Sequence, residues 1–181
     1  MAFIDRDVSA CDYLFRRELT SKIVKDLTRR QFGFYIGGLA MSLITPHFSL
    51  AELQCRCSDP KCDRKDPDMN SDFMKMLEEL RMSTFALRIS SGARCLAHDT
   101  KISPKKNHRG GVHVQSVACD IVVGHLGQSD LIKLLKNCSA IGFSGQGFSF
   151  SGDRKSRFLH ADARHLLPED YGFGKEAVWS Y

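Results

Sequence analysis

Three residues with metal-binding side chains lie in or beside apolar stretches of the chain. His113 follows a long polar segment, Asp120 lies inside VACDIVV, and His160 lies inside RFLHADA. A charged carboxylate in an apolar strand costs several kcal/mol unless it is paired or binds a cation. Two imidazoles and one carboxylate form a three-ligand set for Zn²⁺ that leaves a fourth position open for water, as in catalytic zinc sites. The sequence therefore predicts a zinc site. In the alternative, Asp120 caps a loop and His160 is a hydrogen-bonded core histidine.

Two predicted strands must carry most of this ligand set. The stretch VACDIVV is rich in apolar and β-branched residues, which is typical of a buried strand. Because side chains alternate along a strand, Asp120 lies on one face and Cys119 on the other. In the second stretch, RFLHADA, the same alternation places His160 and Asp162 on one face. The predicted metal therefore binds on one face of a sheet.

The rest of the chain predicts a mixed fold. Apolar residues at helical spacing predict two helices, at 71–81 with Asn70 or Ser71 as its cap and at 129–137 with Ser129 as its cap. The sequence also predicts a short helical turn within 47–55, strands at 86–90 and 141–150, and loops at 55–70 and 91–111. Because helices and strands mix without a βαβ rhythm, the predicted fold class is α+β.

Four sequence blocks resemble a known peptidase family. They are HFSLAELQC (47–55), SSGARC (90–95), HVQSVACDI (113–121) and FLHADAR (158–164), and the closing AVW (177–179) fits the family's terminal tryptophan. Through these blocks, residues 47–181 resemble the zinc D-Ala-D-Ala carboxypeptidase family, specifically its short phage and bacterial branch. The resemblance implies a small hedgehog-like or DD-peptidase-like α+β fold, in which a mainly antiparallel sheet carries the zinc site and helices pack on it.

The resemblance also implies roles for five residues. His113, Asp120 and His160 would bind Zn²⁺. Arg94 would contact the substrate carboxylate or the oxyanion that develops during the reaction; in the alternative it is a loop arginine in a salt bridge. Asp162 would orient a ligand histidine or bind the substrate amine, or would have a purely structural role.

One departure from the family pattern concerns the general base. Many relatives have Glu, Asp or His three or five residues before the last histidine ligand, whereas this chain has Arg157 and Lys155 there. Neither side chain is suited to accept a proton beside zinc. Asp162, Asp153 and His165 are the alternatives. A general base contributes about 10²–10⁴ in rate, so a chain without one would be a slow or inactive enzyme.

These features together predict a zinc-dependent metallopeptidase. We expect it to hydrolyse peptide bonds of peptidoglycan stem peptides, as a D,D- or L,D-carboxypeptidase or endopeptidase, by means of a zinc-activated water. The alternative is a non-catalytic zinc-bearing cell-wall-binding or virion module of the same fold. A hydrolase of an amide outside the cell wall is a third hypothesis. The expected partners are peptidoglycan peptides, and the expected state is a monomer.

Composition excludes several other classes of protein. The chain has 181 residues, of which 43% are hydrophobic and 26% charged, so it is neither disordered nor collagen-like nor a multi-pass membrane protein. Its net charge of +5 is spread thinly, without a run of like charges that would bind nucleic acid.

The first 45 residues predict a leader separate from a domain at 46–181. An uncharged stretch, 32–45, follows Arg29 and Arg30 and is too short to span a bilayer as a helix. The arginine pair and mild hydrophobicity resemble a twin-arginine export signal, which predicts a periplasmic or cell-envelope location with the leader as a signal or anchor. The alternative is a buried N-terminal element of a cytoplasmic or phage-associated protein.

The cysteines add a second group of possible ligands. Seven cysteines cannot all pair within one chain. Cys55, Cys57 and Cys62 lie close together in a polar loop, and Cys95 or His98 could complete a structural zinc site with them. A disulfide between two of the three is the alternative in an exported protein, and free thiols are the third.

Overall fold

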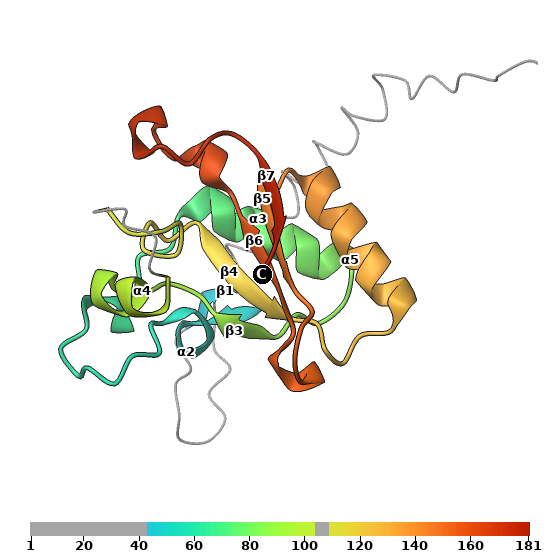
Figure 1. The fold of residues 1–181 in the computed structure, drawn as a ribbon, viewed down its shortest axis with the longest axis horizontal. Helices are drawn as coiled ribbons and strands as arrows, with labels where there is room; N and C mark the ends of the chain where they lie inside the picture. The colour runs from blue at the N-terminus through green and yellow to red at the C-terminus, as the bar shows by residue number, and fades with distance from the viewer. Residues whose placement is uncertain (1–42, 104–108) are drawn as a thin grey trace, which may run out of the picture. The chain divides into compact units, whose positions relative to one another are not determined.

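A computed structural model describes residues 43–103 and 109–181, which have an α+β fold (Figure 1). The predicted fold class is therefore confirmed. The main sheet has five strands in the order β3 (Ile89–Ser91), β4 (Ala118–Val122), β6 (Phe158–Asp162), β5 (Gly145–Ser149) and β7 (Ala177–Ser180). Neighbouring strands are antiparallel except β5 and β7, which are parallel. A separate antiparallel pair consists of β1 (Leu43–Thr45) and β2 (Phe48–Ser49).

Four α-helices accompany the sheets within the described residues: α2 (Leu50–Leu53), α3 (Ser71–Ser83), α4 (Leu96–Ile102) and α5 (Gln128–Ile141). Helices α3 and α5 pack on one face of the main sheet (Figure 1). Their buried Phe73, Leu77 and Leu134 share a core with Cys119 of β4 and Leu159 of β6. Burial of this apolar surface is the main favourable contribution to folding. It leaves the opposite face of the sheet for polar side chains.

Several predicted elements are confirmed, with shifted ends. Helix α3 begins where predicted, because the Asn70 side chain accepts hydrogen bonds from the backbone N–H groups of Asp72 and Phe73. Helix α5 extends beyond 129–137, and Gly127, not Ser129, is its N-cap. Strand β3 begins and ends later than the predicted 86–90.

The prediction of a continuous loop over 91–111 is wrong, because α4 forms within it. This helix has a single buried residue, Asp99, so it lacks the apolar stripe by which helices are found in sequences. Tertiary contacts stabilise it instead. The Cys95 side chain caps its first turn, and Asp99 accepts a hydrogen bond from the backbone N–H of Gly111.

The predicted leader falls almost wholly outside the described residues, which begin at 43. Of the segment 1–45, the structure describes only Leu43–Thr45, which pairs with Phe48–Ser49 in the small sheet. Over 43–103 and 109–181, the structure contains no helix with both the length and the apolar character needed to cross a membrane.

Candidate metal centre

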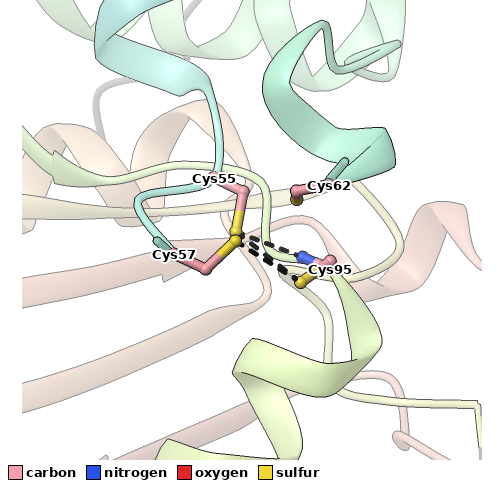
Figure 2. A group of neighbouring side chains, drawn as sticks. All are labelled: Cys55, Cys57, Cys62 and Cys95. Carbon is pink, nitrogen blue, oxygen red and sulfur yellow. Dashed lines mark hydrogen bonds between the residues drawn. The ribbon is translucent and has the colours of Figure 1, made fainter. Parts of the chain in front are cut away.

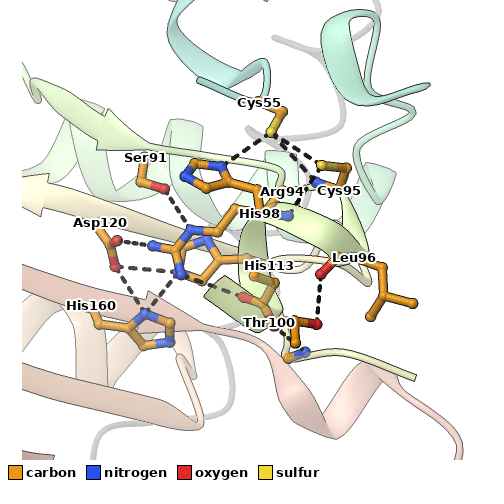
Figure 3. Close-up of polar contacts among 12 residues, drawn as sticks. Cys55, Ser91, Arg94, Cys95, Leu96, His98, Thr100, His113, Asp120 and His160 are labelled. Carbon is orange, nitrogen blue, oxygen red and sulfur yellow. Dashed lines mark hydrogen bonds and ion pairs between the residues drawn. The ribbon is translucent and has the colours of Figure 1, made fainter. Parts of the chain in front are cut away.

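His113, Asp120 and His160 meet on the face of the sheet opposite the helical core (Figure 3). His113 Nε2 lies 3.1 Å from His160 Nδ1 and 3.3 Å from Asp120 Oδ1, and His160 Nδ1 lies 2.9 Å from the same oxygen. All three residues are buried. The structure therefore brings together the three residues that the sequence singled out as metal ligands.

Strand register and a tight turn explain this convergence. Asp120 and His160 are direct partners in the antiparallel pair β4–β6, so their side chains project side by side from one face. His113 arrives from a turn that precedes β4 and closes with a hydrogen bond from the Ser116 N–H to the His113 carbonyl. Ser116 completes this turn in the left-handed backbone region, at a φ of 59°.

The outer nitrogens of the two imidazoles are both hydrogen-bond donors. His113 Nδ1 lies 2.6 Å from the Gly92 carbonyl, which can only accept. His160 Nε2 lies 3.0 Å from Asp162 Oδ2. Burial disfavours the ionised form of Asp162, but hydrogen bonds from His160 and Arg164 outweigh it and hold its pKa well below the usual range. Asp162 is therefore an ionised acceptor, and both histidines present their other nitrogen to the centre of the site.

The inner atoms of the site thus carry lone pairs that face one another. When both imidazoles are neutral, His113 Nε2, His160 Nδ1 and Asp120 Oδ1 are three acceptors within 3.3 Å of one another. One proton can bridge only two of these atoms, whereas a cation among them can bind all three. Ligand atoms at the Zn–N and Zn–O distances of about 2.0–2.1 Å lie about 3.3 Å apart in a tetrahedron. The three residues therefore fit a zinc ion.

The acidity of the two histidines differs because of their surroundings. Burial lowers the pKa of His113. Burial also acts to lower the pKa of His160, but hydrogen bonds to Asp120 and Asp162 outweigh it and raise that pKa. Asp120 has a pKa held well below its usual range despite its burial, because His113 and His160 stabilise the carboxylate. Asp120 is therefore an ionised carboxylate within the site.

Arg94 lies directly against this carboxylate. Its Nη2 is 2.5 Å from Asp120 Oδ2, its Nε donates to Ser91 Oγ at 3.0 Å, and its Nη1 lies 3.6 Å from Asp99 Oδ1 (Figure 3). Arg94 thereby holds one carboxylate oxygen and leaves Asp120 Oδ1 for the histidine nitrogens. An arginine has five N–H donors, so Arg94 retains donors beyond those used by Ser91 and Asp120.

Asp162 lies behind the ligand His160 and is fully buried. Its two oxygens accept from His160 Nε2 and from three nitrogens of Arg164, at 2.7–3.0 Å. The strand β5 leaves room for it, because a Cβ atom at Gly145 would lie 2.1 Å from Asp162 Oδ2. This placement favours the orienting role for Asp162 over contact with a substrate amine.

The other candidates for a general base have hydrogen-bond partners away from the three ligands. Asp153 is exposed and its carboxylate accepts from the backbone N–H of Lys155. His165 is exposed and pairs through Nδ1 with Ser144 Oγ at 2.8 Å. The structure does not bring either side chain into contact with the three-ligand group.

Two aromatic residues at the end of the chain border the site. The Trp179 ring lies 5.2 Å from the His160 ring and packs under the Arg164 guanidinium. Tyr181 is mostly exposed but packs on Trp179, and partial desolvation of its hydroxyl together with the charge of Asp120 raises its pKa. The family pattern pointed to the tryptophan, but no sequence signal indicated Tyr181.

A second cluster of potential ligands lies beside the first. The sulfur atoms of Cys55, Cys57, Cys62 and Cys95 lie within 4.8 Å of one another, and this group could bind a metal ion (Figure 2). Cys95, not His98, completes the set of four; His98 Nδ1 lies 3.3 Å from Cys55 Sγ. All four cysteines are free thiols in this structure.

The thiols of the cluster differ in acidity. Burial opposes ionisation of Cys55, but hydrogen bonds from the backbone of Cys95 and Cys57 and from His98 lower its pKa to about 6. Burial raises the pKa of Cys62 to about 12. The cluster therefore already favours one thiolate at neutral pH.

Comparison of the chain with models of protein families, with curated proteins and with solved structures finds no match in any of the three.

Proposed function

We propose that this protein is a zinc-dependent metallopeptidase that hydrolyses peptide bonds of peptidoglycan stem peptides. The observation that carries the proposal is the convergence of three buried acceptor atoms, from His113, His160 and Asp120, on one point. Such a set with a fourth position available for water is the donor arrangement of catalytic zinc sites. The α+β fold with its mainly antiparallel sheet supports assignment to the hedgehog-like or DD-peptidase-like fold.

The residues around the site have separable roles in this proposal. When bound, zinc would lower the pKa of a water molecule and polarise the scissile carbonyl. The Gly92 carbonyl and Asp162 hold the two imidazole rings by their outer nitrogens. Arg94 holds Asp120 and offers its remaining N–H groups to the oxyanion or to a substrate carboxylate.

The choice of peptidoglycan as substrate rests on the four sequence blocks that resemble the zinc D-Ala-D-Ala carboxypeptidases. Two of these blocks supply all three ligands, and the SSGARC block supplies both Arg94 and the Gly92 carbonyl that holds His113. The resemblance thus covers residues that the structure brings together. A cell-wall substrate also agrees with the proposed export of the protein, or with its use by a phage.

A second candidate function is a zinc-bearing module that binds the cell wall without cleaving it. It is favoured by the surroundings of the proposed bases. Both Asp162 oxygens accept from His160 or Arg164. Asp153 contacts its own loop, and His165 pairs with Ser144. A site that holds zinc but has no group to accept a proton would hydrolyse peptides slowly or not at all.

Digestion of purified peptidoglycan by the zinc-loaded full chain tests the proposal. We expect soluble products whose masses identify the cleaved bond, and no products from a His113→Ala variant that is equally folded. Tight binding to peptidoglycan without products would support the non-catalytic module. Neither binding nor products would contradict both functions.

A further inference from the structure

We propose that Cys55, Cys57, Cys62 and Cys95 bind a structural Zn²⁺, and that this metal holds the segment 91–95 in the position that places Arg94 beside the first site. The binding of the metal stands independently of the peptidase assignment. Its effect on Arg94 rests on the proposed function.

The geometry of the sulfur atoms matches a tetrahedral thiolate site. Cys95 Sγ lies 3.9 Å from Cys55 Sγ and 4.0 Å from Cys57 Sγ. Ligands at the Zn–S distance of about 2.3 Å lie about 3.8 Å apart in a tetrahedron. All pairs among the four sulfur atoms are within 4.8 Å, so small movements would complete the site. These separations are well above the S–S bond length of about 2.05 Å.

Nearby donors and one cation compensate the negative charge of such a site. Backbone N–H groups donate to sulfur at two points, from Cys95 to Cys55 at 3.5 Å and from His98 to Cys95 at 3.4 Å. The ammonium group of Lys65 lies at the same loop and donates to the carbonyls of Cys55 and Cys57, at 2.9 and 2.7 Å. Hydrogen bonds and an adjacent positive charge favour thiolates over thiols.

The loop that carries three of these cysteines has little regular secondary structure. Between α2 and α3, the described backbone contains only a short 3₁₀ turn, Asp63–Lys65, with no buried residue in it. Loops of this length without regular structure are uncommon in compact domains unless they have a function or a constraint. A metal that joins this loop to Cys95 would supply that constraint, as structural zinc does in small folds.

The segment 91–95 connects the cysteine cluster to the first site. Cys95 is a sulfur ligand of the cluster, and Arg94 next to it contacts Asp120 (Figure 3). Two residues earlier, the Gly92 carbonyl accepts from His113 Nδ1, and a Cβ atom at Gly92 would lie 2.5 Å from the backbone oxygen of Leu53. The segment is therefore packed tightly against α2, immediately before the first cysteine. A metal at the cluster would bind Cys55, just after α2, and Cys95, at the end of the segment 91–95, and would so hold the segment against the helix.

The ligand type restricts the metal. Four thiolates in a tetrahedral arrangement select zinc or iron, whereas Ca²⁺ and Mg²⁺ require oxygen ligands. We assign zinc.

Metal analysis and cobalt substitution of the reduced full chain test the proposal. We expect two zinc ions per wild-type chain, and thiolate-to-cobalt charge-transfer absorption after exchange with Co²⁺. A His113→Ala variant should keep that absorption and lose one ion. A Cys57→Ser/Cys62→Ser variant should lose the absorption and keep one ion. Cys138→Ala, which removes a buried cysteine outside the cluster, is the matched control and should keep both.

The zinc affinity of the first site measures whether the cysteine site positions the segment 91–95. In the Cys57→Ser/Cys62→Ser variant, we expect zinc to bind the first site about tenfold more weakly, the lower end of the effect of changing groups that support metal ligands. A Cys62→His variant that keeps Cys57 should retain both the second ion and the wild-type affinity of the first site, because Cys₃His also binds zinc. Unchanged affinity would overturn the positioning role.

The outcomes separate the two proposals. Absence of thiolate–cobalt absorption in the reduced wild-type chain, or iron in place of zinc, would overturn the cysteine-site proposal even if the protein cleaves peptidoglycan. Retention of the absorption in a protein without peptidase activity would support the cysteine site and contradict the proposed function.

Discussion

Replacement of Asp162 by Asn should weaken zinc binding without changing a metal ligand. The wild-type carboxylate accepts from His160 Nε2 and Arg164 Nη2 at one oxygen, and from Arg164 N and Nε at the other. An asparagine replaces one of these acceptors with an NH₂ donor. Whichever way the amide is oriented, its NH₂ group replaces an oxygen that accepted two hydrogen bonds, so a donor faces two donors.

One amide orientation acts directly on the metal site. With NH₂ toward His160, the Nε2 atom must accept, so the ring proton moves to Nδ1, the atom that faces Asp120 and His113. A protonated Nδ1 cannot bind zinc. Loss of a supporting group of this kind costs about 10- to 100-fold in metal affinity, which is about 1.4–2.7 kcal/mol.

Chelator competition measures this change, with the fluorescence of Trp179 as the reporter. Trp179 is the single tryptophan of the chain, and its ring lies 5.2 Å from that of His160. Asp153→Asn, on an exposed loop, is the matched control and should bind zinc as the wild type does. Wild-type affinity in a folded Asp162→Asn variant would refute the role of Asp162 in holding His160.

Three further predictions follow from the same contacts and from the leader. Gly147→Ala places a Cβ atom 2.5 Å from the tryptophan ring, so urea denaturation should show a loss of about 1–3 kcal/mol; unchanged stability would contradict the close packing of β5 against Trp179. Arg94→Ala removes the partner of the ligand carboxylate, and kcat on stem peptides should fall by about 10²–10³; an unchanged kcat would exclude the oxyanion role. Replacing Arg29 and Arg30 by Lys should keep the protein inside a cell that exports the wild type, as measured by fractionation, and unchanged export would contradict the leader proposal.

The sequence could indicate the two strands of the site because each holds a polar side chain in an apolar run. Asp120 stands out in VACDIVV, and the period of two separates it from the core residue Cys119. The sequence did not give the register. Asp120 and His160 lie in segments 40 residues apart, and the alternation within one strand fixes the face of each residue but not which residue of a distant strand lies opposite it.

The local sequence pattern could predict neither the short helix α4 nor the choice of Cys95 as the fourth member of the cluster, because both depend on contacts with other parts of the chain. Helix α4 is held by the Cys95 cap and by contacts of Asp99 with Arg94 and Gly111. Its own sequence has no apolar face that would predict it. The choice between Cys95 and His98 as the fourth member of the cluster depends on how that helix starts, so the spacing of the cysteines left both open.

The most direct test of the central claim is anomalous diffraction at the zinc edge from crystals of the zinc-loaded full chain. We predict a peak about 2.0–2.1 Å from His113 Nε2, Asp120 Oδ1 and His160 Nδ1, and a second peak among the four cysteine sulfur atoms. A peak at the cysteines with none among His113, Asp120 and His160 would show that those three atoms share a proton, not a metal, and would contradict the proposed peptidase.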